Sequence, residues 1–182
     1  MLIVFIKKRM VLNSIKIGIV VAATAVTALT GPTQFIVSDT TEIRNPERIQ
    51  VNTPPCLQMY KHIKAYADTF DIPLRYAFGI ARIETGYLGP MHWRYNPEQI
   101  SSAGALGPMQ VMLSTARGIN KDNVTRHQLR TDIEYNVRTS MKLLRRLYNL
   151  RGNWKLVFGE YNTGRPCVNG YAIKVSNHKL NW

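Results

Sequence analysis

The chain is poor in cysteine, histidine and acidic residues. Its 182 residues include two cysteines, four histidines and 11 acidic residues against 24 basic ones, for a formal net charge of +13. The histidines lack the spacing of metal ligands, so we expect no metal site and no other cofactor. Few carboxylates are available for acid–base chemistry, which narrows the choice of a catalytic residue.

The positive charge lies mainly in the part of the chain that we expect to fold. Residues 1–40 carry four basic residues and one acidic residue, so +10 of the net charge lies in residues 41–182. A basic surface favours a polyanionic partner, such as a cell-wall polymer, a membrane face or nucleic acid. Charge alone does not choose among these partners.

The N-terminus has the features of a targeting segment. Four basic residues precede an apolar run at 17–29, which is short for a membrane-spanning helix and suits the core of a signal peptide. We therefore predict a signal peptide or N-terminal membrane anchor at 1–30, a polar linker at 31–54 and a folded domain at 55–182. The chain is expected to be exported to the periplasm or cell envelope.

Cys56 and Cys167 are the two cysteines. In an exported protein, an even number of cysteines favours a disulfide. This bridge would join the first helix of the domain to its last segment. Two unpaired thiols are the alternative.

Apolar residues from Pro55 onward recur at helical spacing, with helix-ending residues between the runs. The pattern predicts one helix from Pro55 to about Phe70 and a second that ends near Glu84. Residues 87–107, rich in Gly, Pro, Asn and Ser, are predicted to form a long loop, which inside a compact domain is usually functional. A further helix is predicted from Pro108 to Arg117.

Three helices are predicted in the remainder of the chain. A capping box at Thr131 and Glu134 indicates the start of a long amphipathic helix that ends at Gly152. Asn153 is expected to cap the next helix, which Gly164 ends, and a last helix is predicted at 168–177. No strand alternation, repeat or low-complexity tract is present, so the predicted fold is an all-α, compact globule.

Glu84 occupies an unusual position for a carboxylate. It lies at the end of an apolar helix, just before Gly86 and the long loop. The negative end of the helix dipole and the apolar surroundings both raise the pKa of a carboxyl there. A raised pKa is what a general acid near neutral pH requires, so Glu84 is the candidate catalytic residue.

Two downstream segments strengthen this hypothesis. Residues 102–112 are small and glycine-rich, so their backbone can approach a ligand closely, and Gln110 offers both a donor and an acceptor. The segment 160–164 contains Tyr161, whose hydroxyl needs a partner if it is buried. Glu84 is a natural partner if Tyr161 packs toward the second helix.

Together these segments resemble the lytic transglycosylase domain of the goose-type-lysozyme-like superfamily. The matching segments are Glu84-Thr85, Gly104-Ala105-Leu106-Gly107-Pro108-Met109-Gln110, Asp132-Ile133-Glu134-Tyr135-Asn136-Val137 and Glu160-Tyr161-Asn162. They keep the family's order over roughly residues 55–175. The departures are Thr85 in place of a serine, Pro108 in place of a leucine and Glu160 in place of a small residue.

The resemblance implies a lysozyme-like helical globule with an active-site cleft that cleaves peptidoglycan glycan strands. Glu84 would be the single acid/base for the bond between N-acetylmuramic acid and N-acetylglucosamine, and a 1,6-anhydro sugar would be the product. Tyr161 would donate a hydrogen bond to Glu84. The implied substrate-binding residues are Thr85, Ser102, Met109, Gln110, Tyr161 and Asn162.

Alternatives remain open for both function and partners. A muramidase that uses water would need a second carboxylate, for which Glu98 and Glu160 are the local candidates. A basic wall- or nucleic-acid-binding module without catalysis is the other alternative, although nucleic acid is the less favoured ligand. The resemblance also suggests service to a secretion, conjugation or phage-entry machine, with a virion-associated location in the last case.

Overall fold

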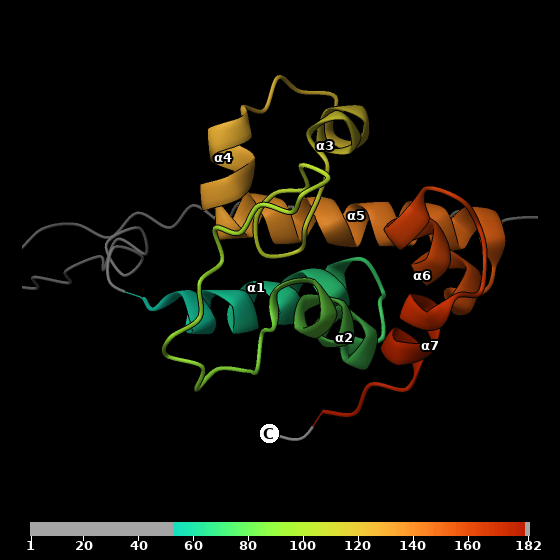
Figure 1. Cartoon of the computed structure of the whole chain (residues 1–182), viewed down its shortest axis with the longest axis horizontal. Coiled ribbons are helices and arrows are strands. Elements are labelled where there is room, and N and C mark those ends of the chain that lie inside the picture. Colours follow the sequence, from blue (N-terminus) through green and yellow to red (C-terminus); the bar gives the residue numbers. More distant parts are fainter. Residues whose placement is uncertain (1–52, 181–182) are drawn as a thin grey trace, which may run out of the picture. The chain divides into compact units, whose positions relative to one another are not determined.

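The computed structural model describes residues 53–180. They form seven α-helices and no strand, only two isolated β-bridges, Ile100–Leu106 and Leu106–Val111. The helices are α1 (Pro55–Thr69), α2 (Leu74–Thr85), α3 (Leu113–Asn120), α4 (Arg126–Thr131), α5 (Ile133–Arg151), α6 (Trp154–Thr163) and α7 (Gly170–Ser176) (Figure 1). The predicted all-α fold is confirmed.

The predicted signal peptide or anchor at 1–30 lies outside the described residues, as does nearly all of the linker at 31–54. Within residues 53–180, no helix combines the length and the apolar character that crossing a membrane requires. The N-terminal predictions therefore stay predictions.

Helix α5 is central to the described domain. It contacts α1, α3, α4 and α6, and in the view of Figure 1 α1 runs along one side of it, with α3 and α4 on the other. Ile133, Val137, Met141 and Leu144 recur along α5 at helical spacing, and each is at most 5% exposed. This stripe buries α5 in the hydrophobic core.

Helix α7 brings the C-terminal segment to the helix that carries Glu84. It contacts both α2 and α6, and α6 in turn contacts α5. The N-terminus of α7 is capped by Asn169, whose side chain accepts a hydrogen bond from the Ala172 N–H at 2.9 Å. This cap fixes where α7 begins, and so where Tyr171 lies.

Several predicted helix limits are confirmed. Gly86, Gly152 and Gly164 end α2, α5 and α6 in the left-handed conformation, with φ angles of 70°, 63° and 75°. Glycine adopts this conformation without the steric cost that a Cβ brings. Asn153 caps α6 as predicted, by accepting a hydrogen bond from the Lys155 N–H at 2.9 Å.

The helix predicted from Pro108 to Arg117 is wrong at its start. Helix α3 begins only at Leu113, and a tight turn precedes it. Leu106 and Val111 exchange both backbone hydrogen bonds at 3.0 Å, and Gln110 has a φ of 51°, which no α-helix contains. The glycine-rich segment thus folds back on itself before the helix.

The capping box predicted at Thr131 and Glu134 is also wrong. Asp132 caps α5 by accepting a hydrogen bond from the Tyr135 N–H at 2.9 Å, whereas Thr131 is the last residue of α4, a helix that was not predicted. The Glu134 carboxylate accepts a hydrogen bond from the Tyr66 hydroxyl at 2.5 Å. It therefore joins α5 to α1 instead of closing a cap.

Candidate active site

Glu84 lies in the last turn of α2, where the apolar residues Ala77, Ile80 and Ala81 bury the helix. Its side chain is half-buried, and the Tyr171 hydroxyl donates a hydrogen bond to its Oε1 at 2.6 Å. Burial raises the pKa of Glu84 above the ordinary value for a glutamate, and the hydrogen bond from Tyr171 partly offsets this rise. The carboxyl can therefore hold a proton at a pH where exposed glutamates have lost theirs.

The hydrogen bond predicted between Tyr161 and Glu84 is made by Tyr171 instead. The Tyr161 hydroxyl donates to the Met109 carbonyl at 2.7 Å and lies 2.9 Å from the Ser140 hydroxyl. Burial, reinforced by the nearby Glu84 charge, raises the pKa of both phenols. Both tyrosines therefore stay protonated and act as hydrogen-bond donors beside Glu84.

Thr85 ties the end of α2 to the loop that follows. Its buried hydroxyl shares its one proton between the carbonyls of Pro108 and Ala81, at 2.9 and 3.2 Å, and lies 2.8 Å from the Tyr95 hydroxyl. Burial raises the pKa of Tyr95 to about 12, so this phenol also keeps its proton. The Thr85 hydroxyl is therefore engaged inside the protein, at the position next to Glu84 in the chain.

Asn136 holds the glycine-rich segment against α5. Its Oδ1 accepts from the Met109 N–H at 3.0 Å, and its Nδ2 donates to the carbonyls of Leu106 and Leu129, both at 2.8 Å. A Cβ at Gly107 would come within 2.5 Å of this Nδ2, so only glycine permits the approach. Asn136 is fully buried, and all three bonds replace contacts with water.

The other residues predicted to bind substrate differ in accessibility. The Met109 side chain is fully buried. The Met109 backbone lies at the site, where its N–H donates to Asn136 and its carbonyl accepts from Tyr161. Gln110 is half-buried, and its Nε2 donates to the carbonyls of Gly107 and Gln99 at 2.8 and 3.2 Å. Ser102 and Asn162 are exposed, and the Asn162 Oδ1 accepts from the Asn169 Nδ2 at 3.3 Å.

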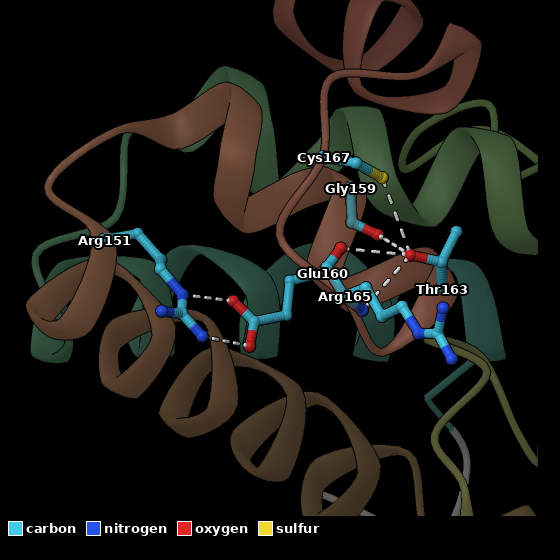
Figure 2. Close-up of polar contacts among 6 residues, drawn as sticks. All are labelled: Arg151, Gly159, Glu160, Thr163, Arg165 and Cys167. Atoms are coloured by element: carbon cyan, nitrogen blue, oxygen red, sulfur yellow. Dashed lines mark hydrogen bonds and ion pairs between the residues drawn. The ribbon is translucent and has the colours of Figure 1, made fainter.

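Both carboxylates that a hydrolytic mechanism would use are engaged in ion pairs. The Glu160 carboxylate binds Arg151 through two hydrogen bonds of 2.7 and 2.9 Å (Figure 2), and this pairing lowers the pKa of Glu160. Glu98 lies 3.4 Å from the Arg130 guanidinium. Among residues 53–180, no second carboxylate contributes to the raised pKa of Glu84.

Both cysteines are free in the structure, which therefore does not contain the predicted disulfide. Cys56 is buried in the first turn of α1, where its carbonyl accepts from the Tyr87 hydroxyl at 2.7 Å. The Cys167 Sγ lies 3.7 Å from the Thr163 hydroxyl (Figure 2). The Cys167 carbonyl packs so closely on α6 that a Cβ at Gly159 would meet it at 1.8 Å.

Two free thiols are expected per purified chain in the absence of reductant. In the native protein the half-buried Cys167 should react with a maleimide first, whereas Cys56, at 1% exposure, should react only as the domain opens. Mass analysis after native and denaturing labelling measures both rates. A chain that takes no label even when denatured would contradict the structure.

Two residues of the candidate site were not singled out from the sequence, although Asn136 lies in the segment 132–137 that resembles the family pattern. Tyr171 lies on a helix of seven residues near the C-terminus, outside the segments that carry the resemblance. Its signal is its place two residues after Asn169, a good N-cap residue that starts the helix. Asn136 could have been found in the sequence because Ser140 lies one turn further along α5, so the two form a polar stripe on a helix that faces the core.

The helices and the half-buried Glu84 carboxyl have the arrangement of a lysozyme-like enzyme domain. Residues 61–180 match the transglycosylase SLT domain family, and the chain belongs to this family. The 1.65 Å crystal structure of the 70-kDa soluble lytic transglycosylase Slt70 from Escherichia coli is similar, with 29% identity and a TM-score of 0.50. That match covers 64% of this chain and 18% of Slt70.

An inactive mutant of the lytic transglycosylase Slt from Pseudomonas aeruginosa is also similar, with 22% identity and a TM-score of 0.48. The match covers 57% of this chain and 16% of that one, so this chain spans less than a fifth of the length of either solved enzyme. No curated protein matches the chain.

Proposed function

We propose that the chain is a peptidoglycan lytic transglycosylase. In this proposal Glu84 donates its proton to the oxygen of the β-1,4 bond that joins N-acetylmuramic acid to N-acetylglucosamine, and the bond breaks. The Glu84 carboxylate then removes the proton of the muramoyl 6-hydroxyl, whose oxygen bonds to the anomeric carbon. The product ends in 1,6-anhydro-N-acetylmuramic acid, and Glu84 regains its proton.

The state of Glu84 is the observation that carries this proposal. A general acid must hold a proton near its working pH, and the burial of Glu84 raises its pKa accordingly. Ordinary glycosidases use two carboxylates, the second of which attacks the sugar or activates water. Glu98 and Glu160 are instead paired with arginines. An internal hydroxyl already attached to the substrate removes the need for a second carboxylate.

The surrounding residues take two roles in this proposal. Thr85, Met109 and Tyr161 position Glu84 and the glycine-rich segment, because their polar groups bond within the protein. Ser102, Gln110 and Asn162 are the residues that we propose to contact the glycan. The proposal also includes export to the periplasm or cell envelope and membrane anchoring through residues 1–30. It further includes service to a secretion, conjugation or phage-entry machine.

Product analysis tests the function. Purified protein is incubated with peptidoglycan sacculi, and the released fragments are analysed by mass spectrometry beside a Glu84→Gln control. Anhydro ends from the native protein alone support the proposal. Reducing ends would replace it with the muramidase alternative, and a folded protein that releases nothing would favour the binding module.

Tyr171→Phe is expected to move the pH profile of the enzyme. The Tyr171 hydroxyl stabilises the ionised form of Glu84 and so lowers its pKa, which means that removing the hydroxyl raises the pKa further. Activity that needs protonated Glu84 is lost as pH rises through this pKa. The alkaline limb of kcat/KM should therefore shift to higher pH. Tyr148→Phe is the control, because the Tyr148 ring stacks on Trp154 and is not a cause of the shifted pKa of Glu84. An unchanged alkaline limb in Tyr171→Phe would contradict the assignment.

A further inference from the structure

The loop after α2 exposes three large apolar side chains. Leu88, Met91 and Trp93 are 48%, 70% and 58% exposed. Together with His92 and Arg94 they line a hollow of about 430 Å³, and no acidic residue contributes to it. Large apolar side chains that gather on a surface usually mark a binding site, because exposing them to water is unfavourable.

The loop is held in this shape by its own hydrogen bonds. The His92 Nδ1 accepts from the Leu88 N–H at 3.3 Å, and the His92 N–H donates to the Gly89 carbonyl at 3.2 Å. Tyr95, which follows Arg94, is buried with its ring centroid 5.0 Å from that of Tyr87. Tyr87 and Tyr95 thus anchor the loop, and Trp93 is left free to contact a ligand.

The hollow lies beside the candidate active site. Tyr95 contacts Thr85, the neighbour of Glu84, through their hydroxyls at 2.8 Å. Leu88 follows Glu84 by four residues, so their Cα atoms are at most about 14 Å apart. A polymer bound at Glu84 is long enough to span this distance.

We propose that residues 88–94 form an additional subsite for the glycan strand, outside the sugars that flank the cleaved bond. The Trp93 ring stacks on the apolar face of a sugar, and Arg94 binds a carboxylate of the strand, which muramic acid and its stem peptide both carry. Apolar walls with a few charged groups are typical of small-molecule sites, and an arginine–carboxylate pair adds orientation. This subsite rests on the proposed function, since it takes the same polymer.

Binding without cleavage tests the subsite. The full chain carrying Glu84→Gln is titrated with purified glycan strands and with the shortest disaccharide–peptide fragment, alone and combined with Trp93→Ala or Trp93→Phe. Leu150→Ala is the matched control, because Leu150 is an equally exposed apolar residue on α5. Trp93→Ala should raise the dissociation constant for long strands about tenfold, which equals roughly 1.4 kcal/mol. Trp93→Phe should raise the dissociation constant for long strands less, and the dissociation constant for the short fragment should not change in either variant.

Two outcomes would overturn the subsite. Equal binding by Trp93→Ala and Leu150→Ala would show that the ring contacts no sugar. Lost binding to phosphatidylglycerol vesicles, with strand binding intact, would assign the loop to a membrane surface instead. The proposed function is judged separately by its anhydro products, so a Trp93 effect without such products would leave a glycan-binding site and remove the catalysis.

Discussion

Glu84→Gln is expected to lower the rate of peptidoglycan cleavage by roughly 10²- to 10⁴-fold, the usual contribution of a general acid–base. The amide keeps the shape of the side chain and can still accept the hydrogen bond from Tyr171, but it has no proton to give and cannot serve as a base. The rate of release of anhydro-ended fragments measures the loss. Glu98→Gln, which only breaks an exposed ion pair with Arg130, should retain activity and is the control.

The same substitution has an expected effect on stability that depends on pH. Burial raises the pKa of Glu84 in the folded state above its unfolded value, so the stability that this group contributes is fully present below the unfolded pKa. It is lost as pH rises through the folded pKa. The glutamine in Glu84→Gln does not ionise, so the variant does not lose stability in this way. The free energy of unfolding of the variant, relative to that of the native protein, should therefore increase from acid to neutral pH. A difference that stays constant with pH, or retained cleavage, would contradict the role given to Glu84.

Much of the fold could be predicted because helices carry their signals locally. The apolar spacing of α5 and the glycines that end α2, α5 and α6 are visible in the sequence, and the structure confirms them. The position of Glu84 at the end of an apolar helix also follows from local pattern. The raised pKa of Glu84 agrees with that prediction, because burial causes the rise.

The segment before α3 could not be predicted in the same way. Its shape depends on Asn136, which lies about 30 residues away and binds the carbonyl of Leu106 and the N–H of Met109. A Gly-Pro pair followed by helix-forming residues favours a helix locally, and the contacts with α5 override this preference. As a result, the backbone of Gln110 adopts the left-handed conformation, with a φ of 51°.

The choice of tyrosine beside Glu84 depended on tertiary packing as well. Tyr161 belongs to a segment that resembles the family pattern, yet its hydroxyl bonds Met109 and Ser140 because α6 packs on α5. Helix α7 fills the space between α6 and α2, and so Tyr171 contacts Glu84. Spacing along the chain gives no information on which of two aromatic residues, ten positions apart, makes this contact.

Asn136→Ala is expected to lower the free energy of unfolding by about 3–5 kcal/mol. It removes the side-chain partner of the Met109 N–H and of the Leu129 carbonyl, and it removes one of the two donors to the Leu106 carbonyl, which keeps its hydrogen bond from the Val111 N–H. The affected groups are the Met109 N–H and the carbonyls of Leu106 and Leu129, around a side chain with 0% exposure. The loss corresponds to a fall in Tm of roughly 10–20 °C for a domain of this size. Chemical and thermal unfolding measure both quantities.

Asn136→Asp separates hydrogen bonding from side-chain volume, because the carboxylate can still accept from the Met109 N–H but faces two carbonyls that it cannot satisfy. We expect it to be destabilised as well, whereas the control Lys142→Ala, at an exposed position of the same helix, should stay within about 0.5 kcal/mol of the native protein. Under conditions where Asn136→Ala is still folded, its cleavage rate should also fall, because the Met109 carbonyl that accepts from Tyr161 is no longer held in place. A loss of stability below about 1 kcal/mol would mean that water satisfies these groups and that the glycine-rich segment is held by other contacts.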